Sequence, residues 1–469
     1  RHRAAGGRGV SYRNFLDAKT VDHAPTGIVR DLSGYPLFPH QRELAEWALR
    51  RGRAAIFAST GLGKTRMHLA WGREVADETQ LPVIVLAPLA VAEQTVAEGR
   101  AIGVPVTHVR QQSEVVAGVN VCNYERLHRL DPAAFGGVVL DESSIIKHHD
   151  AKTFGLLLEA FERTAFKLCA TATPAPNDWT ELGTHAEFLG VRSRTEMLSE
   201  FFVHDGGETQ TWRLKGHARH EFWRWVASWG AMIQSPADLS HDDSAYRLPA
   251  LNVHEHTIKS GHAKAGELFA IEAQTLSERR DARRASLDER VAACARKVSA
   301  ESGEPWIIWC DLNAEGDALR KSIPGAVEIR GSDTIEEKES RLTAFARGEI
   351  RVLVTKPSIA GWGLNWQHCA RMAFVGVTDS FEAYYQAVRR CWRFGQKRPV
   401  DVHIFASELE GAVVANLKRK EADALAMGAA LSAETAAFVR ENVLGVTRER
   451  NPYNPSRRIA APDFLRTGT

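Results

Sequence analysis

The residues with the clearest chemistry follow a short apolar run near the start of the chain. Ala54 to Phe57 forms this run, and Ala58-Ser59-Thr60-Gly61-Leu62-Gly63-Lys64-Thr65 follows it, before a helix-like segment that ends near Ala76. A strand that ends in a small-residue turn and opens a helix presents several N–H groups and a positive helix end to one place. This pattern predicts a phosphate-binding loop, in which Lys64 reaches the β- and γ-phosphates and Thr65 is a ligand of Mg²⁺.

Ala58 stands where the strict phosphate-binding pattern has glycine. The loop alone is therefore equally compatible with an ordinary turn between a strand and a helix. Partners elsewhere in the chain must decide, because nucleotide hydrolysis also needs a carboxylate for the metal and a group that orients water. It usually needs an arginine as well, to stabilise the transition state.

A pair of acids follows a second apolar run, Gly137 to Leu140. Doubly wound sheets place their ligands at the carboxyl ends of the strands, which is where Asp141 and Glu142 would lie. Asp141 is suited to bind Mg²⁺, and Glu142 is suited to polarise water. A plain strand end is the alternative interpretation of the same two residues. Phe166 to Thr171 predicts a further strand, and the hydroxyl groups at its end could link the nucleotide site to a nucleic-acid groove.

Arginines gather late in the chain, in the segment from Gln386 to Gln396. Arg390 and Arg393 are three residues apart, which predicts that they share one face of a helix and could reach a γ-phosphate bound on another domain. Arginine suits this task because its planar fork pairs with two phosphoryl oxygens and stays charged. Alone, an arginine-rich helix is more often a solvated face.

A glutamine near the N-terminal end of the chain is a further candidate. Gln41 follows Phe38-Pro39-His40 and opens an amphipathic helix. Its amide both donates and accepts, so it could read the edge of an adenine base. An ordinary helix cap is the alternative.

Composition points to a globular protein rather than a membrane or fibrous one. The chain has 469 residues, of which 44% are hydrophobic and 25% charged. No apolar run approaches the roughly 20 residues that cross a bilayer, so we expect no membrane contact. The net charge of +2 says nothing about nucleic acid. Because the chain begins at Arg1 rather than Met, a missing N-terminus and a removed signal peptide stay open.

The cysteines give a further indication of the compartment. The six cysteines show no Cys-x-x-Cys spacing, so we expect reduced thiols in an intracellular, cytoplasmic protein. His368-Cys369 lacks two further ligands at metal spacing, so we do not expect a zinc site there.

Alternating strand-like and helix-like segments predict two α/β domains. We expect a flexible basic arm over residues 1–30 and a nucleotide-binding domain over 31–200. A Trp-rich and charged helical linker is expected over 201–297, a second α/β domain over 298–430, and a C-terminal tail over 431–469. Phe222, Trp225, Val226 and Trp229 share one helical face, which indicates packing rather than base stacking. Residues 273–297 are predicted to form one exposed helix.

In this order, the residues resemble the motifs of helicase-like superfamily 2 ATPases, and among them the Swi/Snf-type translocases. Leu140-Asp141-Glu142 with Lys147 is similar to the second motif of that branch, and Thr173 to Asn177 is similar to the third. Gly361-x-Gly363-x-Asn365 and the segment from Gln386 to Gln396 match the fifth and sixth. The resemblance spans about residues 37 to 425. Compact, phage- or prophage-carried members look closest. Ser143-Ser144 replaces the usual Ala-His after the acids.

The resemblance implies an α/β fold of two RecA-like, doubly wound parallel-sheet lobes with an ATP cleft between them. It implies a DNA-stimulated ATP hydrolase that moves along DNA, which we expect to be duplex and held by sequence-independent phosphate contacts. An RNA helicase of the DEAD/DEAH kind and a DNA-binding scaffold with a degenerate ATPase are the alternatives. The residues expected to act in catalysis are Lys64, Glu142, Gln386, Arg390 and Arg393; those expected to bind ATP are Gln41, Ser59, Thr60, Gly61, Gly63, Lys64, Thr65, Gly363 and Asn365; and those expected to bind Mg²⁺ are Thr65 and Asp141.

Overall fold

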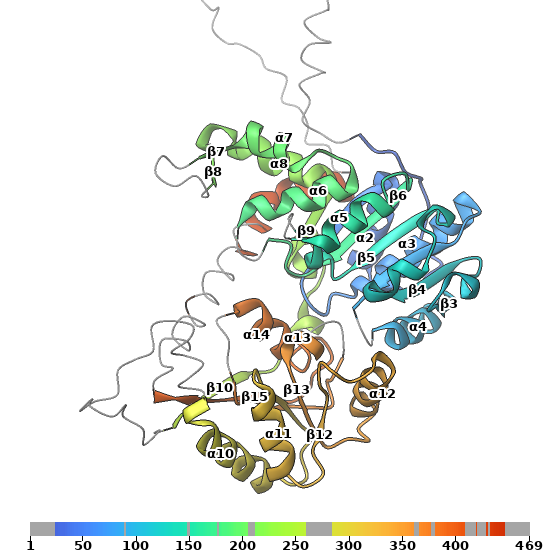
Figure 1. The fold of residues 1–469 in the computed structure, drawn as a ribbon. Helices are drawn as coiled ribbons and strands as arrows, with labels where there is room; N and C mark the ends of the chain where they lie inside the picture. The colour runs from blue at the N-terminus through green and yellow to red at the C-terminus, as the bar shows by residue number, and fades with distance from the viewer. Residues whose placement is uncertain are drawn as a thin grey trace, which may run out of the picture.

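The computed structural model describes residues 24–88, 91–147, 151–175, 178–204, 212–258, 284–360, 365–376 and 380–408, together with 419, 428–429 and 432–445. These residues form two α/β lobes, each built around a parallel sheet, and a small hairpin on the first lobe (Figure 1). The predicted fold class is therefore confirmed. Most of the predicted N-terminal arm and the tail beyond residue 445 lie outside the described residues.

The first lobe has a seven-stranded parallel sheet in the order β3-β4-β2-β5-β6-β1-β9. Its strands are β1 (Arg53–Ala58), β2 (Val83–Ala87), β3 (Val106–His108), β4 (Val119–Asn123), β5 (Gly137–Asp141), β6 (Phe166–Thr171) and β9 (Gly230–Ile233). β2 and β5 are buried along their whole length, as expected for a parallel sheet covered on both faces. Phe57 pairs with Thr171, and Asp141 pairs with Ala170. This register brings the carboxyl ends of β1, β5 and β6 to one edge of the sheet.

Helices and short turns connect these strands. The helices of the first lobe are α2 (Pro39–Arg51), α3 (Lys64–Thr79), α4 (Ala92–Ala101), α5 (Lys152–Ala160), α6 (Leu182–Leu189), α7 (Arg194–Phe201) and α8 (Arg219–Trp229). The hairpin pairs β7 (Phe202–His204) with β8 (Trp212–Leu214) in antiparallel fashion. The main 3-10 turns are η2 (Tyr124–Arg129), η4 (Ser143–Ile146), η7 (Pro236–Leu239) and η8 (Ser244–Tyr246).

The segment expected to be a helical linker differs from that expectation. α8 packs into the core of the first lobe, where Phe222, Trp225, Val226 and Trp229 are all at most 1% exposed. The packing role predicted for this helix is thus confirmed. The next strand, β9, then pairs with β1 in the sheet of the same lobe. A strand of four residues is too short to show a recognisable hydrophobic pattern in the sequence. Only its pairing with β1, far away in the chain, identifies β9 as a strand.

The second lobe has a six-stranded parallel sheet in the order β10-β15-β14-β11-β13-β12. Its strands are β10 (Leu251–Ile258), β11 (Trp306–Trp309), β12 (Val327–Glu328), β13 (Val352–Thr355), β14 (Arg371–Phe374) and β15 (Val400–Ser407), and its helices are α10 (Leu287–Ala300), α11 (Asn313–Ser322), α12 (Ile335–Ala346), α13 (Pro357–Ala360) and α14 (Phe381–Val388). β10 also lies in the segment expected to be a helical linker. α13 and α14 lie on the side of this lobe that faces the first lobe (Figure 1).

The prediction of one exposed helix over residues 273–297 is wrong for its described part. α10 begins at Leu287 and buries Val291, Cys294 and Val298, whose spacing gives the helix an apolar face against the second sheet. On the same face, the buried Arg290 forms an ion pair of 2.8 Å with the buried Glu315 of α11. The charges suggested exposure on every side, but only one face of α10 is exposed. Asp288, Glu289 and Arg296 lie on that face, whereas Arg290 is paired inside the lobe.

Several contacts join the two lobes. Arg126 of η2 pairs with Glu336 of α12 at 2.9 Å, and the Asn123 amide donates to Glu339 at 2.8 Å. A helix over residues 432–444, which follows the second lobe in the chain, returns to the first lobe and buries Val439 and Val443 in its core.

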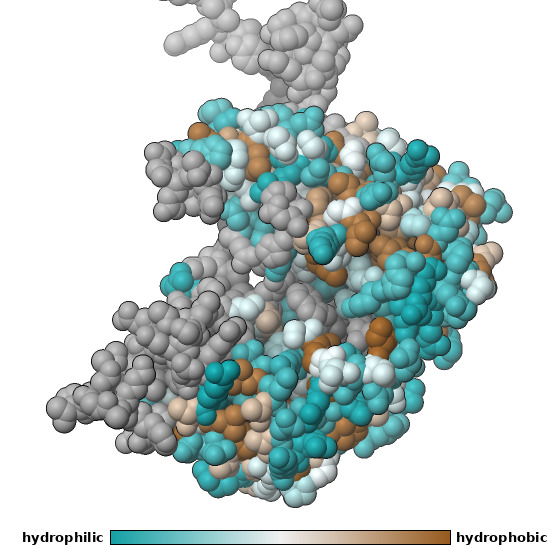
Figure 2. Space-filling view, viewed as in Figure 1, coloured by the Kyte–Doolittle hydropathy of each residue, from teal (hydrophilic) through white to brown (hydrophobic). Residues whose placement is uncertain are grey.

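Most of the described surface seen in Figure 2 is hydrophilic, and the hydrophobic residues on this face lie in small groups. All six cysteines are buried and none forms a disulfide. Within the described residues, no cluster of His, Cys, Asp and Glu could hold a metal ion by itself. Among the same residues, no helix combines the length and apolarity needed to span a membrane.

Candidate active site

The predicted phosphate-binding loop connects β1 to α3. Gly61 and Gly63 have φ angles of +92° and +84°, a region that glycine adopts without steric cost. The ammonium group of Lys64 donates to the carbonyl oxygens of Ala58 at 2.7 Å and Ser59 at 3.3 Å. Thr60 Oγ1 is buried without a hydrogen-bond partner in the described part of the chain. The loop thus curves around the ammonium group of Lys64 and holds the hydroxyl of Thr60 available for a further partner.

Gln41 is packed directly against this loop. Its Nε2 donates to the carbonyl of Leu62 at 3.0 Å, and its Oε1 accepts from the backbone N–H of Phe38 at 3.1 Å. A β-carbon on Gly63 would lie 2.2 Å from Nε2 of Gln41, and the φ of +84° at Gly63 would strain any side chain there. One N–H and one lone pair of the amide remain for other partners. Its predicted contact with adenine stays a prediction, and its observed role is to hold the loop.

The two acids lie at the end of β5, as predicted. Asp141 is 9% exposed, and burial raises the pKa of its carboxyl to about 6, while the charge of Lys64 opposes this rise. Glu142 adopts the left-handed region with φ of +59°, which is uncommon for a residue other than glycine and concentrates at functional sites. Thr171 Oγ1 donates to Glu142 Oε1 at 2.7 Å. The water-polarising candidate is therefore held by a strained backbone and a neighbouring strand.

The two serines that follow the acids have different surroundings. Ser143 Oγ lies 3.1 Å from Nε2 of His185, which α6 supplies. Burial lowers the pKa of His185 to about 4, so its ring is neutral near pH 7. Ser144 Oγ is buried without a hydrogen-bond partner among the described residues. His185 thus places an imidazole against the residue that directly follows the acid pair, and no sequence signal marked it.

The arginine segment belongs to the second lobe. α14 ends at Val388, so Arg390 and Arg393 lie in the turns after the helix, and the prediction that they share a helical face is wrong. The N–H groups of Arg390 and Cys391 bond to carbonyls three residues back, which tightens the chain, and Gly395 has φ of +91°. The turns nevertheless direct both guanidinium groups toward the first lobe.

Gln386 fixes the first of these arginines. Arg390 donates from Nε to the carbonyl of Gln386 and from Nη2 to its Oε1, both at 2.9 Å. Nε2 of Gln386 lies 3.4 Å from Thr173 Oγ1, across the gap between the lobes. Thr173 in turn donates its backbone N–H to Thr171 Oγ1 at 3.1 Å. A continuous polar network therefore runs from Arg390 of the second lobe to Glu142 of the first.

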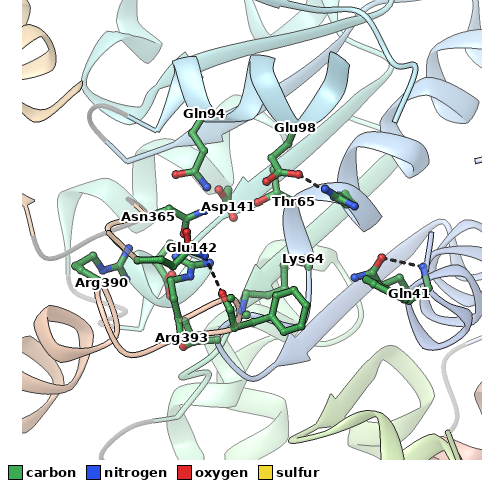
Figure 3. A pocket seen from close by; sticks show the side chains of 18 of the residues that line it. Gln41, Lys64, Thr65, Gln94, Glu98, Asp141, Glu142, Asn365, Arg390 and Arg393 are labelled. Carbon is green, nitrogen blue, oxygen red and sulfur yellow. Dashed lines mark hydrogen bonds and ion pairs between the residues drawn. The ribbon is translucent and has the colours of Figure 1, made fainter. Parts of the chain in front are cut away.

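A cavity of about 370 Å³ lies between the lobes, and the candidate side chains converge on it (Figure 3). The predicted residues that line it are Gln41, Thr60, Gly61, Gly63, Lys64, Thr65, Asp141, Glu142, Asn365, Gln386, Arg390 and Arg393. Ser59 is not among the lining residues, although its carbonyl accepts from Lys64. Gly363 lies outside the described residues.

The cavity wall also includes residues that the sequence did not suggest. Gln94 and Glu98 come from α4, and Glu98 pairs with Arg66 at 2.8 Å. Phe38 and Phe394 add aromatic surface from the first and second lobes. The only sequence signals for these residues are indirect. Phe394 directly follows the predicted Arg393, and Arg66, the partner of Glu98, directly follows the predicted Thr65.

The charges and the hydrogen-bond donors in this cavity fit a nucleoside triphosphate with Mg²⁺. Burial lowers the pKa of Lys64 to about 8, of Arg390 to about 10 and of Arg393 to about 9. Three cations drawn into one buried space favour a polyanion. The Thr65 hydroxyl and the Asp141 carboxylate are oxygen donors of the kind Mg²⁺ takes from protein when phosphates supply further ligands. Asn365 Oδ1, which has no hydrogen-bond partner among the residues that the structure describes, adds another polar atom to the wall.

The two parallel-sheet lobes and the cavity that they share form the arrangement predicted for a pair of RecA-like lobes. Residues 289–395 match the helicase conserved C-terminal domain. The second lobe therefore resembles helicase-type domains, and the predicted resemblance to helicase-like proteins is confirmed over these residues. The placement near phage- or prophage-carried members stays a prediction.

Other comparisons give less. None of the curated proteins matches this chain. Among solved structures, the chain is similar to the Sulfolobus solfataricus SWI2/SNF2 ATPase core in complex with dsDNA, with 16% sequence identity and a TM-score of 0.41. The match covers 89% of this chain and 100% of that chain. Similarity at this level says nothing about activity.

Proposed function

We propose that this protein is an ATPase that converts nucleotide hydrolysis into movement along duplex DNA. One observation carries the proposal: the two lobes send complementary residues into a single cavity. Lys64, Asp141 and Glu142 come from the first lobe, and Arg390 and Arg393 come from the second. Neither lobe holds the complete set, so the chemistry depends on how the lobes meet.

The first lobe would bind the nucleotide and prepare the attack. ATP with Mg²⁺ supplies the phosphoanhydride bond that is cleaved. Lys64 and the N–H groups of the loop hold the phosphates, and the Thr65 hydroxyl and Asp141 carboxylate hold the metal. Glu142 accepts a hydrogen bond from the attacking water and orients it. The 2.7 Å bond from Thr171 fixes the carboxylate of Glu142 for this task.

The second lobe would complete the site from the other side. Arg390 and Arg393 place positive charge where negative charge develops in phosphoryl transfer. The bonds from Arg390 to Gln386 keep that guanidinium oriented. Because these groups move with the second lobe, each cycle of binding and hydrolysis would close and reopen the gap between the lobes.

Nucleic acid would bind between the same two lobes, in a cavity next to the nucleotide site. A second cavity of about 410 Å³ also has walls from both lobes, and Glu142 lines both cavities. Lys147 of the first lobe and Lys338 of the second line it and offer cations for phosphates. A strand bound there would favour lobe closure and would lie next to the water-orienting carboxylate. This position supports stimulation of hydrolysis by nucleic acid without base contacts.

The test is ATP turnover by the full chain with saturating duplex DNA, single-stranded DNA or RNA, beside the Lys64→Ala variant as a control for contaminating ATPases. Displacement of a triplex-forming strand from duplex DNA then reports movement. We expect stimulation by duplex DNA and ATP-dependent displacement. Stimulation by RNA alone would favour the DEAD/DEAH alternative, and DNA binding without turnover would favour the scaffold.

A further inference from the structure

An aromatic residue in the connection between the two sheets contacts both lobes. Tyr246 lies in η8, after β9 of the first sheet and before β10 of the second. Its ring stacks on Phe394 of the second lobe, with 4.6 Å between centroids and 30° between planes. It also meets His40 of α2 edge-on at 5.4 Å, and its hydroxyl lies 3.4 Å from His40 Nε2. Tyr246 therefore bridges the first lobe and the arginine segment.

Phe394 in turn rests on the phosphate-binding loop. A β-carbon on Gly61 would lie 2.7 Å from the Cβ of Phe394, so the loop backbone and Phe394 are in direct contact. The carbonyl of Phe394 accepts from Nε2 of Gln367 at 2.7 Å, which fixes its backbone. Since Phe394 directly follows Arg393, the position of its ring restricts where that guanidinium can lie.

His40, the contact of Tyr246 in the first lobe, also lies next to the phosphate-binding loop. His40 Nε2 lies 3.4 Å from the carbonyl of Leu62, and the neighbouring Gln41 donates to that carbonyl. Tyr246 itself does not line the nucleotide cavity. It contacts residues on both sides of the loop without reaching the reacting groups, so any effect on turnover must pass through those residues.

We infer that Tyr246 is a positioning residue, which holds Phe394 against Gly61 and thereby places Arg393 over the phosphate-binding loop when the lobes close. The inference rests on the proposed function and deepens it. Because η8 belongs to the connection between the lobes, relative motion of the lobes displaces the ring from Phe394. The stack is thus complete only in the arrangement that also completes the site.

The kinetic test compares Tyr246→Ala with Tyr246→Phe, which keeps the ring. We expect Tyr246→Ala to lower kcat on the order of tenfold with little change in KM for ATP, because Arg393 acts mainly on the transition state. Tyr246→Phe should retain nearly full turnover. In an Arg393→Ala background, Tyr246→Ala should add little further loss, because coupled residues are not additive. Tyr35→Ala, in the first lobe and away from the arginine segment, is the control.

A second measurement does not depend on hydrolysis. Leu81→Cys and Lys321→Cys place fluorescent labels on exposed positions of the two lobes, and the native cysteines are all buried. We expect Tyr246→Ala to shift the energy-transfer distribution toward longer distances and Tyr246→Phe to leave it unchanged. An inactive wild type would refute the proposed function alone, and the distances would still test the stack. Unchanged distances in Tyr246→Ala, or loss of turnover that adds fully to Arg393→Ala, would overturn the inference.

Discussion

Thr171 and Glu142 lie at the ends of two adjacent parallel strands and are joined by a hydrogen bond of 2.7 Å. The hydroxyl of Thr171 also accepts from the N–H of Thr173, whose side chain faces Gln386 of the second lobe. The contact therefore couples the water-orienting carboxylate to the gap between the lobes. Sequence alone suggested a polar link at this strand end, but it did not identify Glu142 as the partner.

The first prediction concerns this hydroxyl. Thr171→Val keeps the buried volume but removes the donor to Glu142, so we expect kcat to fall roughly tenfold while KM for ATP changes little. Thr184→Val is the matched control, because Thr184 is equally buried and donates to the carbonyl of Glu181, the residue just before its own helix. Steady-state turnover of both variants decides between a catalytic and a purely structural role. Equal losses in the two variants would count against the positioning of Glu142.

The second prediction separates phosphate binding from water activation. Lys64→Ala should lose both turnover and nucleotide affinity, since Lys64 holds the phosphates. Glu142→Gln should lose turnover but bind nucleotide nearly as well as the wild type, since Glu142 acts on water. Titration with a fluorescent ATP analogue, beside turnover, tests this. A similar loss of affinity in both variants would contradict the assigned roles.

The third prediction concerns the tryptophan helix. Trp225 stacks on Phe201 at 5.5 Å and meets Trp229 at 5.4 Å in the core of the first lobe. Trp225→Ala should lower the free energy of unfolding by about 3 to 5 kcal/mol, as expected for a large buried aromatic. Urea unfolding measures this, with Leu156→Ala, an exposed apolar truncation, as the control. Normal stability combined with weaker DNA binding would instead favour base stacking.

The fourth prediction is a pH dependence of stability. His68 is buried in α3 without hydrogen-bond partners among the described residues, and burial with the charge of Lys64 lowers its pKa from 6.5 to about 3. Between these values the unfolded chain takes up a proton that the folded chain does not, so stability is lost as pH falls below 6.5. Between pH 7 and pH 5, we expect the free energy of unfolding to fall by about 2 kcal/mol less in His68→Leu than in the wild type.

Urea unfolding at several pH values checks this expectation. The exposed His128 offers a control, and His128→Leu should leave the pH profile as it is in the wild type. If His68→Leu showed the same decline of stability with acid as the wild type, the buried neutral ring would not be the cause.

The sequence predicted the parts of the site whose geometry is local. A loop of small residues before a helix, and acids after a buried strand, place their side chains through a few consecutive backbone angles, so Lys64 and Asp141 were found directly. The partners of these residues depend on chain segments far away. Tyr246 meets Phe394, and Thr173 meets Gln386, only because two sheets pack in one arrangement. No periodicity in the sequence carries that information.

The same reasoning explains the errors. β9 was missed because a four-residue strand is defined by its pairing with β1 rather than by its own pattern. α10 was predicted to be exposed because its charges recur at helical spacing, whereas one of its faces is buried, and the ion pair with Glu315 allows Arg290 to lie on that face. The helix predicted over the arginines ends at Val388, where the N–H groups of Arg390 and Cys391 bond to carbonyls three residues back. In the first two cases a long-range contact overrode a local preference.

The last prediction is that the two arginines differ in what they contribute. Arg390 is 2% exposed and held twice by Gln386, whereas Arg393 lies beside Phe394 at the loop. Alanine substitution of either arginine should lower kcat strongly, because an arginine on the γ-phosphate raises the rate by about 10³ to 10⁵ in characterised NTPases. Arg390→Ala should also lower stability, because its removal leaves Gln386 with unsatisfied groups in a buried place.

Arg389 provides the matched control for this prediction, because its guanidinium stacks on the rings of Tyr385 and Trp392, at 5.0 and 4.4 Å, and does not line the cavity. Turnover with saturating duplex DNA, urea unfolding and rescue by free guanidinium ions should be measured for the three alanine variants. We expect guanidinium to restore part of the turnover of Arg393→Ala and none of the stability of Arg390→Ala. Near-normal DNA-stimulated hydrolysis by Arg393→Ala would remove this residue from the site, and a loss as large in Arg389→Ala would show that the segment acts through its fold alone.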